Sequence, residues 1–80
     1  MENRKVNIIS MEELNSNQYV FNIEYTDVRG QPNNRWFFYN SLDNSVEFTD
    51  GTEMFNKLTQ RIISAINNYL IQNNDDYSKN

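Results

Sequence analysis

The chain has 80 residues, a net charge of −4, and neither cysteine nor histidine. This length predicts one domain, and the missing residue types exclude disulfides and zinc sites built from Cys or His. Eleven acidic residues against seven basic ones disfavour a general duplex-DNA binder, which needs clustered Lys and Arg for phosphate contacts. Five Phe, five Tyr and one Trp supply much of the buried area that so small a core requires.

The first half of the chain has the residue alternation of β-strands. Val6 and Ile8 alternate with polar neighbours in a first strand. Residues 11–14 either continue this strand or form a single helical turn, because a capping-box pattern begins at Ser10. The clearest strand covers residues 18–28, where alternate residues divide into two faces. One face holds Tyr19, Phe21, Ile23 and Tyr25, and the other holds Val20, Asn22, Glu24 and Thr26.

Two further strands are expected after a loop. Residues 29–34 contain the single Pro and one of the two Gly, which is typical of a loop. Residues 35–42 then include four consecutive aromatic residues, which favour a strand. After a tight-turn signal at residues 43–44, Val46 and Phe48 alternate with polar residues in a short fourth strand.

The last third of the chain has the pattern of one amphipathic helix. Asp50 or Thr52 can cap its first turn, and apolar residues then recur every three or four positions. The helix is expected to end near Gln72, and residues 73–80 form a polar tail that is predicted to be disordered. The apolar stripe comprises Phe55, Leu58, Ile62, Ile66 and Tyr69, widened by Met54, Ala65 and Leu70.

Short connections between successive strands predict an antiparallel meander of four strands, with the C-terminal helix packed on one face. The expected fold is a single α+β domain of residues 1–72. If Trp36 and Phe38 face the helix, the alternate residues of their strand point outward, where a partner protein or a second copy of the chain can bind them. The predicted interface consists of Arg29, Arg35, Phe37 and Tyr39.

The sequence contains none of the residue patterns that common catalytic sites require. Without histidine, no serine has its usual base, and the adjacent acids at residues 12–13 and 75–76 are not expected to form a dyad. Two glycines are too few for a phosphate-binding loop or a dinucleotide fingerprint. We therefore expect no enzyme activity, no metal or other cofactor and no small-molecule substrate. No segment matches a signal peptide or a membrane span, so a cytoplasmic location is expected.

These features favour a small, acidic, non-enzymatic protein-binding module. The chain contains fifteen Asn, and Ile and Tyr are also frequent. AT-rich codons encode all three residue types, which indicates an AT-rich bacterium, or a phage or mobile element of one, as the source. The specific hypothesis is an inhibitor or accessory protein that occludes a surface of a host protein.

Two alternative functions follow from the same residues. The predicted strands and helix are similar, at the level of fold only, to the PC4-like single-stranded DNA-binding dimers. This resemblance implies a nucleic-acid-binding dimer in which aromatic residues stack on bases and Arg29 and Arg35 contact phosphates. The other alternative is an acidic mimic of DNA, whose carboxylates bind a DNA-binding enzyme. Its predicted surface consists of Glu12, Glu13, Glu24, Asp27, Asp43 and Glu47.

Overall fold

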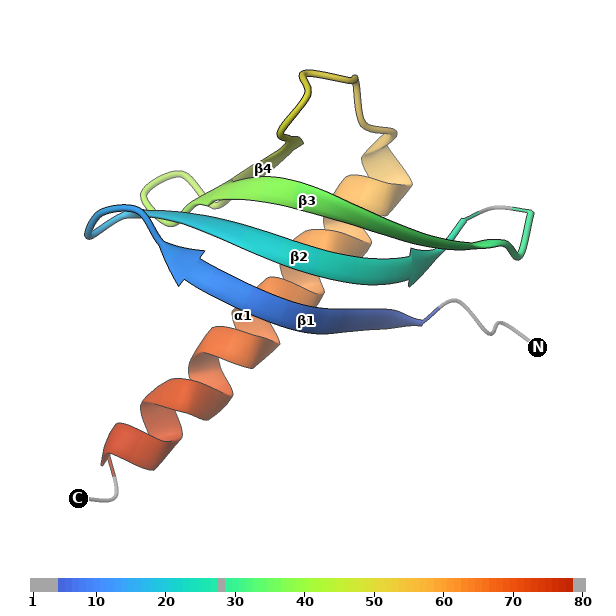
Figure 1. The fold of residues 1–80 in the computed structure, drawn as a ribbon. Helices are drawn as coiled ribbons and strands as arrows, with labels where there is room; N and C mark the ends of the chain where they lie inside the picture. Colours follow the sequence, from blue (N-terminus) through green and yellow to red (C-terminus); the bar gives the residue numbers. More distant parts are fainter. Residues whose placement is uncertain (1–4, 28, 79–80) are drawn as a thin grey trace.

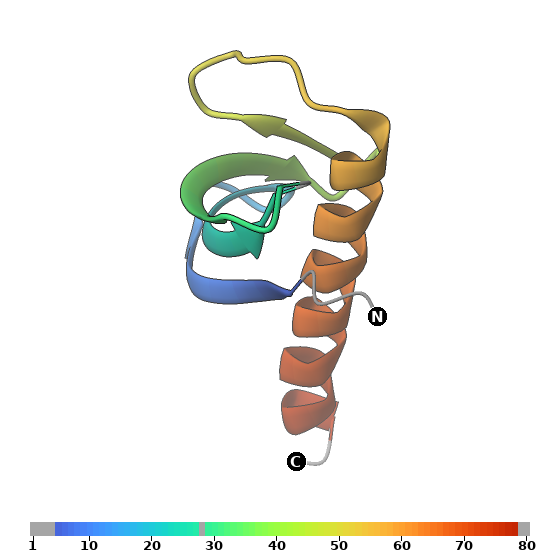
Figure 2. The same cartoon turned by 90° about the vertical axis from the view of Figure 1, so that its right-hand side faces the viewer.

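The computed structural model describes residues 5–27 and 29–78 and confirms the predicted α+β fold. A single sheet has the strand order β1-β2-β3-β4, with every neighbouring pair antiparallel, and one helix follows it (Figure 1). Seen along the sheet, the strands form one layer and the helix a second layer beside it (Figure 2). The elements are β1 (Val6–Glu13), β2 (Gln18–Thr26), β3 (Pro32–Asn40), β4 (Ser45–Phe48) and α1 (Asn56–Ser78).

Strand β1 includes residues 11–13, so the strand interpretation of this segment is confirmed and the helical turn is wrong. A β-bulge interrupts its pairing with β2 between Ile8 and Ser10. Ile9 is the extra residue of the bulge, and its side chain is exposed. A bulge resets which residues face the core. The residue after it, Ser10, pairs with Asn22, while Met11 pairs with Phe21 and packs against the core.

The loop between β2 and β3 is shorter than the sequence indicated, because β3 already begins at Pro32. Pro32 is the first residue of the strand, a position where a missing backbone donor does little harm. The loop closes around Asp27, whose carboxylate accepts backbone hydrogen bonds from Arg29 and Gln31 at 2.9 Å each. These bonds hold the pKa of Asp27 below its ordinary value, with the bond from Gln31 contributing most. Val28 lies outside the described residues.

The core lies between α1 and the face of the sheet that we call the inner face. Phe37 and Tyr39 belong to it, so the prediction that they form an outward interface is wrong. Phe37 is fully buried, with its ring centroid 5.0 Å from that of Phe48. The predicted aromatic face of β2 is confirmed as core-facing, with Tyr19 at its margin. The buried core residues are Phe21, Ile23, Tyr25, Phe37, Tyr39, Phe48, Ile62 and Ile66.

Helix α1 begins and ends later than the sequence indicated. Its first hydrogen bond runs from the amide of Thr59 to the carbonyl of Phe55, so neither Asp50 nor Thr52 caps it. Phe55 therefore precedes the helix and is 80% exposed instead of lying in the core. The helix continues to Ser78, past its expected end near Gln72, and its last turns extend beyond the sheet (Figure 1). Residues 79–80 lie outside the described residues.

A polar link ties the β3–β4 turn to the helix. Asn44 has a positive φ of 56°, a conformation that Asn tolerates better than most residues. Its side-chain oxygen accepts hydrogen bonds from the hydroxyl of Tyr39 at 2.8 Å and from the amide of Asn67 at 3.2 Å. Oδ1 of Asn44 thus links the turn to both β3 and α1. It also provides the hydrogen-bond acceptor that the hydroxyl of the buried Tyr39 needs.

Candidate functional site

The face of the sheet opposite the helix, which we call the outer face, carries exposed aromatic residues. Trp36 is 48% exposed and Phe38 is 38% exposed. In an antiparallel sheet, directly paired residues point to the same face. Phe38 pairs with Val20 on one side and Glu47 on the other, and Val20 pairs in turn with Glu12. One row across the outer face therefore has an apolar centre with a carboxylate at each end.

A second polar feature of the outer face is a pair of asparagine side chains beside Trp36. Asn22 lies directly opposite Trp36, and its amide donates to the side-chain oxygen of Asn34 at 3.0 Å. Asn34 returns a hydrogen bond at 3.3 Å, and Asn22 is buried. Because the two amides satisfy one another, they position β2 and β3 without leaving a buried polar group unpaired.

The outer face is acidic as well as apolar. Glu24 pairs with Asn34 and adds a third carboxylate to those of Glu12 and Glu47. Within the described strands, the single basic residue is Arg35, which lies on the inner face with its register partner Ile23. At one end of the outer face, Phe38 and Glu47 help to line a hollow of about 490 Å³.

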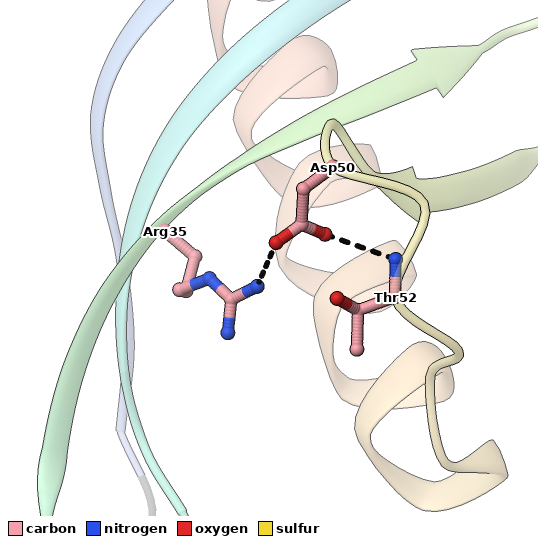
Figure 3. A network of polar contacts seen from close by, with 3 residues as sticks. All are labelled: Arg35, Asp50 and Thr52. Carbon is pink, nitrogen blue, oxygen red and sulfur yellow. Dashed lines mark hydrogen bonds and ion pairs between the residues drawn. The ribbon is translucent and has the colours of Figure 1, made fainter.

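Arg35 is held on the inner face by contacts with the end of β4 and with the loop after it, and Figure 3 shows its contact with Asp50 in that loop. Its guanidinium lies 4.1 Å from the ring centroid of Phe48, and its Nη2 donates to Oδ2 of Asp50 at 3.0 Å. The other oxygen of Asp50 accepts from the backbone amide of Thr52 at 2.9 Å. The bond from Thr52, followed by the charge of Arg35, lowers the pKa of the Asp50 carboxyl.

Arg35 also helps to line a pocket between the inner face and the start of α1, which we call the cationic pocket. Its volume is about 670 Å³, and Arg29, Lys57 and Arg61 line it as well. Four of the seven basic residues of the chain therefore meet at one place. Burial raises the pKa of Tyr25 in the pocket wall, while the charges of Arg35 and Arg61 oppose that rise.

The structure thus divides the residues that the sequence analysis placed together. Of the four predicted interface residues, Arg29 and Arg35 line the cationic pocket, whereas Phe37 and Tyr39 are buried in the core. Trp36 and Arg35 point to opposite faces, so the arrangement proposed for stacking single-stranded bases beside two arginines does not form.

The six predicted mimic carboxylates are also dispersed. Glu12, Glu24 and Glu47 share the outer face. Glu13 pairs with Tyr19 at the end of β1, Asp27 closes the β2–β3 loop through its hydrogen bonds, and Asp43 lies in the β3–β4 turn. The outer face therefore carries three of the six predicted carboxylates.

Sequence reasoning missed the cationic pocket because its residues are far apart in the chain. One local signal was present, since Lys57 and Arg61 are four residues apart and so lie on the same side of a helix. Lys57 and Arg61 come close to Arg29 and Arg35 only because of where α1 lies across the sheet. The spacing of residues along the chain does not specify the position of the helix on the sheet.

No protein-family model, curated protein or solved structure matches this chain. Within residues 5–27 and 29–72, no group of three or more Asp or Glu side chains is placed to hold a metal ion. The helix in this part of the chain is not apolar enough to cross a membrane.

Proposed function

We propose that this chain is a non-enzymatic protein-binding module whose outer face binds a partner with an apolar centre and a rim of Lys and Arg. The observation that carries the proposal is the exposure of Trp36 and Phe38 side by side with Val20, ringed by carboxylates. Exposed apolar patches with a polar rim are typical of interaction surfaces, and Trp is among the residues that contribute most to binding. The hollow beside Phe38 offers room for a side chain of the partner.

The charges favour a protein over nucleic acid as the occupant of this face. Single-stranded nucleic-acid binders combine stacking aromatics with cations that contact the backbone. The described strands place Glu12, Glu24 and Glu47 around the aromatics and place their one basic residue, Arg35, on the other face. Phosphates would be repelled here, whereas Lys and Arg of a protein partner would be attracted.

The same charges favour a different protein over a second copy of this chain. Two outer faces packed against each other would bring six carboxylates into one interface, with no cation from the described strands to offset them. Like charges brought together at an interface are costly. We therefore expect a monomer that binds a basic partner, and an inhibitor or accessory protein of a phage or mobile element that covers a host surface is our specific proposal.

The proposal is tested by capturing partners from a lysate of the source host with the tagged chain and two variants. The first variant, Trp36→Ser with Phe38→Ser, removes the aromatic centre of the outer face. The control, Leu42→Ser, removes another exposed apolar side chain, which lies in the β3–β4 turn. Because all three side chains are partly or largely exposed, both variants should keep the fold.

Binding is then measured with the purified partner. We expect the wild type and Leu42→Ser to bind equally, with affinity that falls as salt rises, and the double variant to bind at least about a hundredfold more weakly. Glu12→Lys with Glu47→Lys should also weaken binding, because it reverses the charge of the rim. Equal affinity of the wild type and the double variant would contradict the proposal.

A further inference from the structure

A buried guanidinium nitrogen in the cationic pocket has no hydrogen-bond partner. Among the described residues, Nη2 of Arg61 is the buried side-chain atom left without an acceptor. Leaving a buried donor unpaired is unfavourable, and more so when the group is charged. Arg61 also lines the cationic pocket, so an anion bound there can supply an acceptor to its guanidinium.

The charge of the pocket indicates the sign of the ligand's charge. Four basic side chains and two acidic ones, Asp27 and Glu53, line it, and Arg35 is already paired with Asp50, which leaves an excess of one positive charge in a chain that is acidic overall. Asp27 is already engaged with Arg29 and Gln31 through their backbone amides. A phosphate monoester, which carries about −1.5 to −2 charges at neutral pH, is attracted by this excess.

The start of α1 adds donors of a second kind. Asn56, Lys57 and Leu58 line the pocket, and the first hydrogen bond within the helix is donated only by Thr59. The first backbone amides of the helix are therefore free to bind an anion, and no acidic side chain in the first turn competes for them.

The remaining walls of the pocket are apolar and aromatic. Phe48 and Tyr25 belong to the core and form its floor, while Phe55 lies at its rim with most of its ring exposed. A volume of about 670 Å³ is within the usual range for sites that bind small molecules. Phe55 is free to stack on a flat ring of a bound molecule.

We propose that the cationic pocket binds a small organic phosphate, a monoester with a flat aromatic or heterocyclic ring. The phosphate accepts hydrogen bonds from Arg61, Arg29 and the first amides of α1, and the ring lies against Phe55. This site is on the opposite side of the sheet from the outer face and does not depend on the function proposed there. It replaces the expectation that the chain binds no small molecule.

The test is a titration of the isotope-labelled 80-residue chain, followed by NMR and calorimetry, with three probes. Adenosine monophosphate carries both the phosphate and the ring, while adenosine and inorganic phosphate each carry one. We expect adenosine monophosphate to shift the amide signals of Thr52, Lys57 and Leu58, and to bind at least about tenfold tighter than either fragment.

Variants separate this site from general attraction of anions. Arg61→Met should weaken binding by at least about tenfold, as should Arg29→Gln, because each removes a charged donor. Lys5→Gln removes an exposed positive charge outside the pocket and should leave the affinity unchanged. Arg61→Met should also keep or raise the urea midpoint of unfolding, because it removes an unpaired buried donor.

Several results would overturn the proposal. One is the absence of amide shifts at millimolar adenosine monophosphate, and another is equal affinity for inorganic phosphate, which would exclude the ring as part of the ligand. If Lys5→Gln lost as much affinity as Arg61→Met, the ligand would be held by non-specific electrostatic attraction to the positive charges of the chain and not by the pocket. A marked fall in stability of Arg61→Met would show that Arg61 serves the fold. In that case, Arg29→Gln, which changes an exposed side chain, still decides whether the pocket binds the ligand.

Discussion

Two adjacent phenylalanines provide the sharpest test of the fold, because they are chemically identical and point to opposite faces of β3. Phe37 is fully buried among core rings, including those of Tyr25 and Phe48. Phe38 is 38% exposed on the outer face. Replacing each one with Ala removes the same atoms, so the difference between the two variants depends on burial alone.

The expected difference is large compared with the stability of so small a domain. Truncation of a fully buried Phe to Ala typically costs about 3–5 kcal/mol, because apolar contacts are lost and a cavity remains. Phe38→Ala should cost no more than about 1.5 kcal/mol, since much of its ring is already in water. At about 0.05–0.15 kcal/mol per residue, an 80-residue chain has about 4–12 kcal/mol in total. Phe37→Ala should therefore bring the chain close to unfolding.

Urea denaturation followed by circular dichroism measures both changes. With a slope of about 1–3 kcal/mol per molar urea, Phe37→Ala should lower the midpoint by about 1 M or more, and Phe38→Ala should lower it much less. A variant of Phe38 that is less stable than the matching variant of Phe37 would refute the assignment of the two faces.

Three further predictions concern single side chains. Because the hydrogen bond from Gln31 lowers the pKa of Asp27 below 3.8, the stabilisation by this carboxylate is present above that value and is lost as the pH falls through the lowered pKa. The urea midpoint of the wild type should therefore fall more steeply below about pH 4 than that of Asp27→Asn, and parallel curves would contradict this. Asn44→Ala removes the nearer acceptor of the Tyr39 hydroxyl, at 2.8 Å, and leaves Asn67 at 3.3 Å. With the positive φ of Asn44 also disfavouring Ala, the change should cost about 1 kcal/mol or more in urea denaturation, whereas no loss would show that this link is dispensable. Phe55→Ser should change stability by less than about 0.5 kcal/mol, since the ring precedes α1 and is largely exposed, and a large loss would return it to the core.

The order of strands and helix was predictable because it depends on local patterns. Alternation along residues 18–26 and the recurrence of Ile62 and Ile66 on one side of a helix indicate the elements directly. The end points were harder to predict. Asp50 has the residue type of a helix cap, but it accepts from Thr52 and Arg35 in the loop, and the helix begins only at Asn56.

Which face of β3 packs in the core could not be predicted. Residues 36–39 are all aromatic, so each face of the strand carries two aromatic side chains and either face could be buried. The decision comes from register across the sheet. Phe37 pairs with Phe21 of β2 and with Phe48 of β4. When Phe37 points inward, these three rings lie together in the core. Trp36 instead lies opposite the polar Asn22. The buried face of β3 therefore depends on residue pairs that are distant in sequence. The same assignment of faces places Trp36 and Phe38 on the outer face and Arg35 in the cationic pocket.

The fluorescence of Trp36, the one tryptophan of the chain, tests the central claim that the outer face is open in the free protein. The measurement is acrylamide quenching of the purified chain over a range of protein concentrations. The structure predicts emission near that of water-exposed tryptophan, efficient quenching, and no dependence on protein concentration, since Trp36 is 48% exposed in a monomer. Blue-shifted emission that acrylamide does not quench would contradict the account, because it would place Trp36 in the core or in an interface between two copies.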